Sequence, residues 1–308
     1  MPLAQSENKE AMSVRERDMK IVISNIALIA VCLIWGSGFS VVKETMNVVD
    51  PSLVVAMRFG IAAVLLGLFC LTRTKFFKPM VMLVGFLLAI PLYLAFYLQT
   101  VGLTGTTASN AGFITGMHVI FTPLLCFIFL KKKLSLYTVF GVLLATFGLG
   151  FMSLGENLAF SQGDMMVLGG ALMFAVHMVL LSKYTLEYDG IWLSFSQIFW
   201  VAVIGFGVSF KHIPTIATFA NKTFFSLFYL GAAGTAFAYL VQTVAQKYTS
   251  PTSTAIIFQT EAVFSAVFGY ILLGEVMGVR QWIGAAMILT GILICEMWDL
   301  RDTRKASD

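Results

Sequence analysis

Long apolar runs separated by short polar turns dominate this chain from residue 21 onward. Each run is about 17 to 22 residues long, which suits an α-helix that crosses the hydrocarbon core of a bilayer. The sequence lacks the alternating ten-residue pattern of a transmembrane barrel. The pattern predicts ten membrane helices, at roughly 21–42, 53–71, 80–97, 110–130, 134–154, 165–181, 191–210, 224–244, 254–273 and 279–297.

The composition agrees with a polytopic membrane protein. Of 308 residues, 58% are hydrophobic and 12% are charged, whereas an average soluble domain is ~25% charged. The net charge of +4 is small, and no nucleic-acid partner is expected from it. The four cysteines lie inside apolar runs without metal-ligand spacing, so we expect no metal, no cofactor and no disulfide framework.

The Lys and Arg residues are distributed unevenly between the turns. If the N-terminus is in the cytoplasm, fifteen of the twenty fall on the cytoplasmic side and four outside, with Arg58 inside the second apolar run. Basic residues accumulate in cytoplasmic loops of membrane proteins. We therefore predict a multi-pass protein of the cytoplasmic membrane with both termini in the cytoplasm.

Two parts of the chain resemble each other. A shift of 143 residues aligns Gln99–Met152 with the stretch that begins at Gln242, with ten identities in 54 positions. A shift of 139 aligns Asp50 with Asp189 nearer the start of each part. Because each part holds five helices, an odd number, the two parts are expected to insert in opposite orientations, as in many secondary transporters.

The predicted fold is an all-α polytopic membrane protein built from two inverted five-helix repeats. Its parts are a cytoplasmic arm at 1–20, a first repeat at 21–154, an extracytoplasmic linker at 155–164, a second repeat at 165–298 and a cytoplasmic tail at 299–308.

Several short motifs stand in a fixed order along these helices. They are Trp35-Gly36-Ser37-Gly38-Phe39 and Lys43 in the first, Arg58-Phe59 in the second, Leu272-Leu273-Gly274-Glu275 after the ninth, and Gly284 with Gly291 in the tenth. Together they resemble the ten-helix EamA-type branch of the drug/metabolite transporter superfamily, over residues 21–298. The resemblance implies a 5+5 inverted repeat that carries small metabolites, often amino acids outward, by alternating access.

A carboxylate, Glu261, lies near the middle of the ninth run. An unpaired charge in hydrocarbon costs ~2.5–3.5 kcal/mol on insertion scales, so Glu261 should face protein, water or a partner. Helical spacing places it on a small, polar stripe with Ser265. The 143-residue shift sets it opposite His118, which shares a stripe with Thr122. We expect Glu261 and His118 to form a polar, protonatable element of a central pathway; the alternative is that each only ties helices together.

Other residues are weaker candidates for the substrate pathway. Arg58 can attract a substrate carboxylate, or its side chain can extend to the membrane interface instead. Trp35 with Gly36 and Gly38 indicates either a hinge or close helix packing. The remaining candidates are polar or aromatic side chains of later helices: Tyr93, Tyr97, Gln99, His177, Tyr239 and Gln242.

These features predict a secondary transporter of small organic solutes, with export of amino acids or related metabolites as the first hypothesis. Multidrug efflux or metabolite uptake is the alternative within that class, and a non-transporting receptor or assembly protein is the alternative outside it. An enzyme is not expected, because the sequence shows no nucleophile–base motif and no phosphate-binding GxxxxGK. The expected partners are a small-molecule substrate and the lipid bilayer; proton coupling, and monomer against homodimer, stay open.

Overall fold

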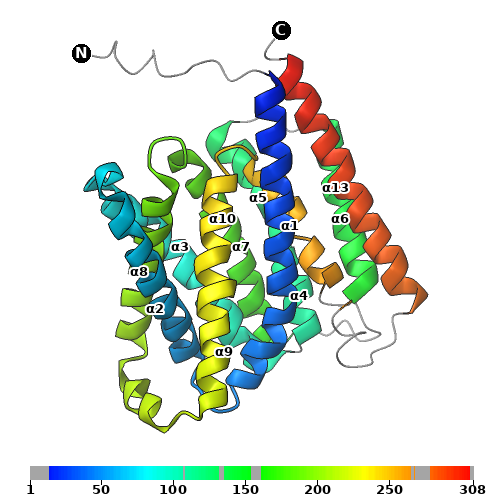
Figure 1. The fold of residues 1–308 in the computed structure, drawn as a ribbon. Coiled ribbons are helices and arrows are strands. Elements are labelled where there is room, and N and C mark those ends of the chain that lie inside the picture. Colours follow the sequence, from blue (N-terminus) through cyan, green and yellow to red (C-terminus); the bar gives the residue numbers. More distant parts are fainter. Residues whose placement is uncertain are drawn as a thin grey trace.

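The computed structural model describes residues 14–106, 108–131, 135–153, 161–264, 267 and 278–305. Within these ranges every regular element is helical, as expected (Figure 1). The α-helices are α1 (Val14–Thr45), α2 (Pro51–Cys70), α3 (Met80–Gly102), α4 (Ala108–Gly116), α5 (His118–Leu130), α6 (Leu136–Ser153), α7 (Gln162–Tyr184), α8 (Gly190–Val208), α9 (Asn221–Gly231), α10 (Ala238–Ala245), α11 (Pro251–Ile257) and α13 (Val279–Lys305). Shorter helical segments are η1 (Leu71–Phe76), η2 (Leu103–Gly105), η3 (Phe210–Thr218) and η4 (Ala232–Phe237), of which η4 is a π-helix.

Six helical stretches in the described part of the chain are long and apolar enough to cross a membrane. They correspond to the predicted runs one, two, three, six, seven and eight. Runs four, five and ten correspond to shorter apolar helices, and run nine lies partly outside the described residues. The described part of the molecule is therefore helical, with six candidate membrane spans, whereas the count of ten spans stays a prediction.

Two of the predicted helices are interrupted. The run expected at 110–130 consists of α4 and α5, with Met117 between them. In the run expected from 254, α11 ends at Ile257, the chain turns at Phe258 and Gln259, and a new helix begins at Thr260. Both breaks lie where the two parts of the chain align, one directly before His118 and the other directly before Thr260 and Glu261.

Aspartates at equivalent positions begin α2 and α8. Asp50 caps α2, and its Oδ1 accepts a hydrogen bond from the backbone N–H of Ser52 (2.9 Å). Asp189 caps α8 by accepting hydrogen bonds from the N–H groups of Ile191 (3.1 Å) and Trp192 (3.3 Å). An N-terminal carboxylate satisfies backbone donors that a helix leaves unpaired, so both helix starts are encoded locally.

Helices α6 and α13 lie side by side along one flank of the bundle (Figure 1). Their backbones touch at two points: a Cβ added to Gly148 would lie 2.7 Å from the carbonyl oxygen of Gly284, and one added to Gly291 would lie 2.6 Å from that of Gly141. The two contacts are equivalent under the 143-residue shift, because Gly148 corresponds to Gly291 and Gly141 corresponds to Gly284. A two-fold relation between the two helices produces this reciprocity.

Other packed pairs also join elements that are distant in sequence. Helix α2 packs against α8, α3 against α7, and α1 against α9, η4 and α10. Buried apolar side chains of α2, α3, α8 and η4 form one core cluster, which includes Phe59, Leu92, Ile198 and Ala236. The two parts of the chain therefore interdigitate, and their shared interior holds the candidate site.

Candidate functional site

A cavity lies among the helices of this shared interior, and its walls come from both parts of the chain. They are formed by α1, α2, α3, α4, α5, α7, α9, η4 and α10 together with the turn at Phe258 and the start of the next helix. The cavity offers about 70 Å³ of space to the centres of water-sized molecules. One water needs about 10–15 Å³ of such space, so the cavity has room for a small organic solute.

Most of the predicted pathway residues meet at this cavity. Its lining includes Trp35, Gly38, Arg58, Gln99, His118, His177, Tyr239, Gln242 and Glu261. These residues come from seven different helical elements and from stretches up to 226 positions apart. The sequence pattern names these residues as candidates, and the fold brings them together.

The side chain of Arg58 is held rigidly at the cavity wall. It is only 6% exposed, so the alternative in which it extends to the membrane interface is wrong for this structure. Its Nε donates to the Oγ1 of Thr235 (3.0 Å), and its Nη2 donates to the carbonyl oxygen of Gly234 (3.2 Å). The guanidinium carbon lies 4.5 Å from the ring centre of Phe96, within the range of a cation–π interaction.

The π-helical segment η4 supplies the partners of Arg58. A π-turn is rare and frees backbone carbonyl groups from the usual helical bonding. The Gly234 carbonyl oxygen accepts bonds from both Arg58 and the indole Nε1 of Trp35 (2.8 Å). Thr235 in turn donates to the carbonyl oxygen of Leu230, five residues earlier (2.7 Å). This local distortion therefore orients two cavity residues at once.

Glu261 and His118 each lie at the start of a helix that follows a break. His118 is the first residue of α5, and Glu261 is the second residue of the helix that begins at Thr260. A helix N-terminus favours negative charge nearby. The Glu261 carboxylate is half-buried and makes no hydrogen bond to the described residues. No ion pair of the described part of the chain involves Arg58 or Glu261.

The imidazole of His118 is buried and forms a hydrogen bond from Nδ1 to the Thr115 carbonyl oxygen (2.7 Å). The ring of Phe258 lies 6.3 Å from it, centre to centre. No direct hydrogen bond joins His118 to Glu261 among the described contacts. The two residues thus share a cavity without a direct bond between them.

Aromatic rings form the apolar part of the wall in a pseudo-symmetric arrangement. Trp35 contacts Tyr239 (5.9 Å between ring centres), and Phe174 contacts Phe96 (5.1 Å). These two contacts are equivalent in the repeat: the shift of 139 relates Trp35 to Phe174, and the shift of 143 relates Phe96 to Tyr239. Phe96 and Tyr239 meet each other at 5.9 Å. The sequence pattern does not single out Phe96 and Phe174, because phenylalanines in apolar runs look the same whether they face lipid or a cavity.

A buried polar chain begins at His177. Its Nε2 forms a hydrogen bond with Gln197 Oε1 (2.7 Å), and Gln197 Nε2 donates to Thr243 Oγ1 (3.1 Å). Gln197 occupies the position equivalent to Arg58, so the two parts differ in charge at this point. The cation of the site therefore comes from one part of the chain only.

The remaining candidates do not line the cavity. Tyr93 lies in the apolar cluster between α2, α3 and α8, where its ring stacks on that of Tyr97 (5.7 Å). Thr122 is fully buried and donates to the carbonyl oxygen of His118 within its own helix (2.8 Å). Ser265 lies outside the described residues.

The glycines of the first helix do not behave alike. Helix α1 runs without interruption through Gly36 and Gly38. A Cβ added to Gly38 would meet no atom within 4 Å. Gly38 therefore widens the cavity, whereas Gly36 is buried.

The fold and the cavity together define a class: a polytopic membrane protein with a small, charged and aromatic cavity in its interior. The sequence pattern of the EamA-like transporter family matches residues 22–154 and again residues 161–296. The chain belongs to this family, and its membership points to a membrane transporter rather than an enzyme.

Named relatives agree with this assignment. A protein of Archaeoglobus fulgidus called an uncharacterized transporter is 32% identical over 280 residues, which cover 91% of this chain and 87% of the relative. The uncharacterized transporter YyaM of Bacillus subtilis is 25% identical and covers 89% of this chain and 94% of its own length. A solved crystal structure matches the fold with a TM-score of 0.75 at 14% identity, over 93% of this chain and 99% of that one.

Proposed function

We propose that the protein is a secondary transporter that moves small organic solutes across the cytoplasmic membrane by alternating access. Two inverted five-helix repeats would rock against each other around the cavity, with both termini in the cytoplasm. The reciprocal glycine contacts of α6 with α13, and the family match to two successive ranges of the chain, support this arrangement.

The observation that carries the proposal is the presence of Arg58 and Glu261 in one cavity without an ion pair between them. Two of the three guanidinium nitrogens donate to η4, and Nη1 makes no hydrogen bond to the described part of the chain. Arginine presents donors suited to a carboxylate, and a carboxylate attracts an ammonium group. A zwitterion such as an amino acid satisfies both groups at once.

The aromatic rings around these charges favour an apolar substituent on the solute. Trp35, Phe96, Phe174, Tyr239 and Phe258 surround the same space, and apolar walls with few polar groups are typical of small-molecule sites. We therefore infer amino acids or related metabolites as cargo, with export as the direction that the family resemblance favours. Glu261 is the residue that we assign to proton binding, if transport is coupled to protons.

The test is transport by the purified protein in proteoliposomes, with a panel of labelled amino acids and with organic acids and amines that lack one of the two charges. We expect flux of zwitterions to exceed flux of either singly charged set. Arg58→Met should abolish that preference, whereas Phe129→Leu, at a 70% exposed side chain, should not. Absence of flux for every solute from a folded protein would overturn the proposal.

A further inference from the structure

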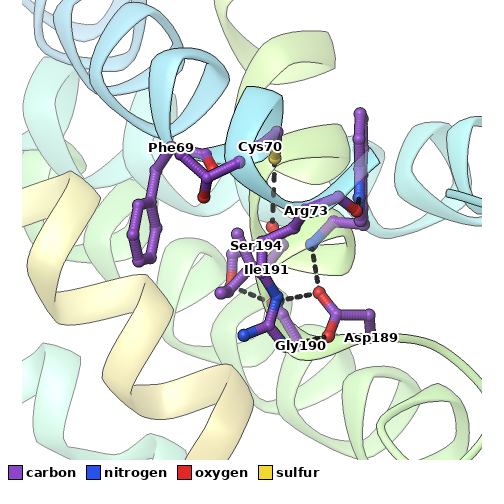
Figure 2. Close-up of polar contacts among 9 residues, drawn as sticks. Phe69, Cys70, Arg73, Asp189, Gly190, Ile191 and Ser194 are labelled. Carbon is purple, nitrogen blue, oxygen red and sulfur yellow. Dashed lines mark hydrogen bonds and ion pairs between the residues drawn. The ribbon is translucent and has the colours of Figure 1, made fainter. Parts of the chain in front are cut away.

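An ion pair joins the end of α2 to the start of α8. Arg73, in η1 directly after α2, places its Nη2 3.0 Å from the Oδ2 of Asp189, the capping residue of α8 (Figure 2). The indole Nε1 of Trp192 donates to the backbone carbonyl oxygen of Arg73 (2.9 Å). This end of the α2–α8 pair is therefore fastened by a side-chain contact and a backbone contact.

The opposite end of the same helix pair carries the equivalent contact. Adding 139 to Arg73 gives His212, in η3 directly after α8, and subtracting 139 from Asp189 gives Asp50, the capping residue of α2. The Nε2 of His212 lies 3.7 Å from the Oδ2 of Asp50. Because α2 and α8 run antiparallel, the two ion pairs lie at opposite ends of the helix pair and thus towards opposite faces of the membrane.

The two contacts differ in chemistry. An arginine is charged at every physiological pH, so the attraction between Arg73 and Asp189 is permanent. Histidine is the side chain whose charge ordinarily changes between pH 5 and 8, and only the protonated form of His212 attracts Asp50. The other two histidines of the chain, His118 and His177, line the cavity.

We propose that the two ion pairs act as latches: each holds one end of the α2–α8 pair closed while the two halves rock against each other. Loss of a proton from His212 releases the latch at its end. This inference rests on the alternating access proposed above. If α2 and α8 belong to opposite halves, a rocking motion separates them at one end while it brings them together at the other. Low pH on the His212 face closes that end, and higher pH there favours its opening.

Among the described residues, the segments at this end carry few other charges. Helix α8 contains no charged residue, and the only one in α2 is Arg58, in the cavity. The ionisable groups of the neighbouring segments are Lys211 beside His212 on η3, Lys43 and Glu44 at the end of α1, and Lys222, which pairs with Glu44 (2.6 Å). Histidine is the residue type among these whose charge ordinarily changes between pH 5 and 8, and the variants below test whether a response in that range at this end comes from His212.

Distance measurements between spin labels test the latches without a substrate. In a cysteine-free background, one label pair, Leu71→Cys with Glu187→Cys, reports on the Arg73 end. The equivalent pair, Phe210→Cys with Val48→Cys, reports on the His212 end; all four positions are exposed. Between about pH 5.5 and about 8 we expect the longer-distance population of the second pair to rise about two- to five-fold, the range that an exposed ion pair can supply, while the first pair shortens.

Variants of His212 identify the group. His212→Arg should hold the low-pH distribution at both pH values, and His212→Gln should hold the high-pH distribution. Arg73→His should transfer a pH response to the other end. Identical distributions at the two pH values in the parent, or a full pH response in His212→Gln, would overturn the latch. Missing flux in proteoliposomes would instead count against the proposed function, because the distances are measured without cargo.

Discussion

The side-chain amide of Gln259 donates a hydrogen bond to the carbonyl oxygen of Gly116 (2.9 Å), and the two residues are 143 positions apart. The same interval relates Glu261 to His118. A residue can touch its own counterpart only close to the axis that relates two repeats. The two broken helices therefore meet at their breaks, and the charged and imidazole side chains that follow the breaks enter the same cavity.

The glycine contacts between α6 and α13 predict a local limit on side-chain size. In Gly291→Ala the new methyl group would lie 2.6 Å from the Gly141 carbonyl oxygen and 3.0 Å from the Ala145 backbone N. Because backbone atoms cannot move aside cheaply, we expect a loss of about 1–3 kcal/mol, visible as a lower melting temperature in detergent. Gly207→Ala, at an exposed helical position with no atom within 4 Å, is the control and should melt at or above the parent temperature.

The hydroxyl of Thr235 is expected to set the affinity for the anionic group of the cargo through Arg58. Thr235→Val keeps the shape and removes the acceptor for the Arg58 Nε. A hydrogen bond to a charged group contributes about 1.5–3 kcal/mol, so we expect the apparent KM for a zwitterion to rise about 10- to 100-fold with a smaller change in the maximal rate. The best-transported amino acid of the proteoliposome panel serves as the substrate.

Thr235→Ser is the matched control, because it retains the hydroxyl. A serine variant as impaired as the valine variant would show that packing around η4, and not the bond to Arg58, sets the affinity.

The sequence was sufficient for much of the fold because its apolar runs have the length that a bilayer demands. It was also sufficient to single out Glu261 and His118, since an ionisable side chain in an apolar run is costly. The partners of Arg58 could not be foreseen. Gly234 and Thr235 are 176 and 177 positions away, and the segment Ala232–Phe237 carries no residue pattern that distinguishes a π-turn from an α-helix.

The positions of some aromatic side chains, like the partners of Arg58, could not be predicted from the sequence. Tyr93 and Tyr97, two candidates for the substrate pathway, stack on each other outside the lining of the cavity, whereas Phe96, between them, reaches Arg58. The 139-residue shift that pairs Asp50 with Asp189 also pairs Arg73 with His212. Applied to every charged residue, it indicates the two end contacts of α2 and α8.

Filling the space at Gly38 should separate transport from stability. Gly38→Leu places a side chain where a Cβ meets nothing within 4 Å and where the cavity begins. Leucine is a better helix former than glycine by roughly 0.5–1 kcal/mol, so we expect an unchanged or raised melting temperature together with loss of flux. Gly207→Leu, also in open space but outside the cavity lining, should transport normally; equal inhibition by both variants would contradict the assignment of the cavity.

The last prediction concerns Glu261 and protons. If this carboxylate binds the coupling proton, Glu261→Gln fixes the neutral state and should abolish accumulation of cargo driven by a pH gradient. Exchange of labelled for unlabelled cargo needs no net proton movement and should continue, and its rate should no longer vary with pH through this residue. Glu187→Gln, at an exposed position in the turn that follows α7 and outside the cavity lining, is the control and should keep the gradient-driven flux. Full gradient-driven accumulation by Glu261→Gln would assign coupling elsewhere and leave Glu261 as a ligand for the cargo's ammonium group, in which case exchange of zwitterions, but not of singly charged acids, should weaken.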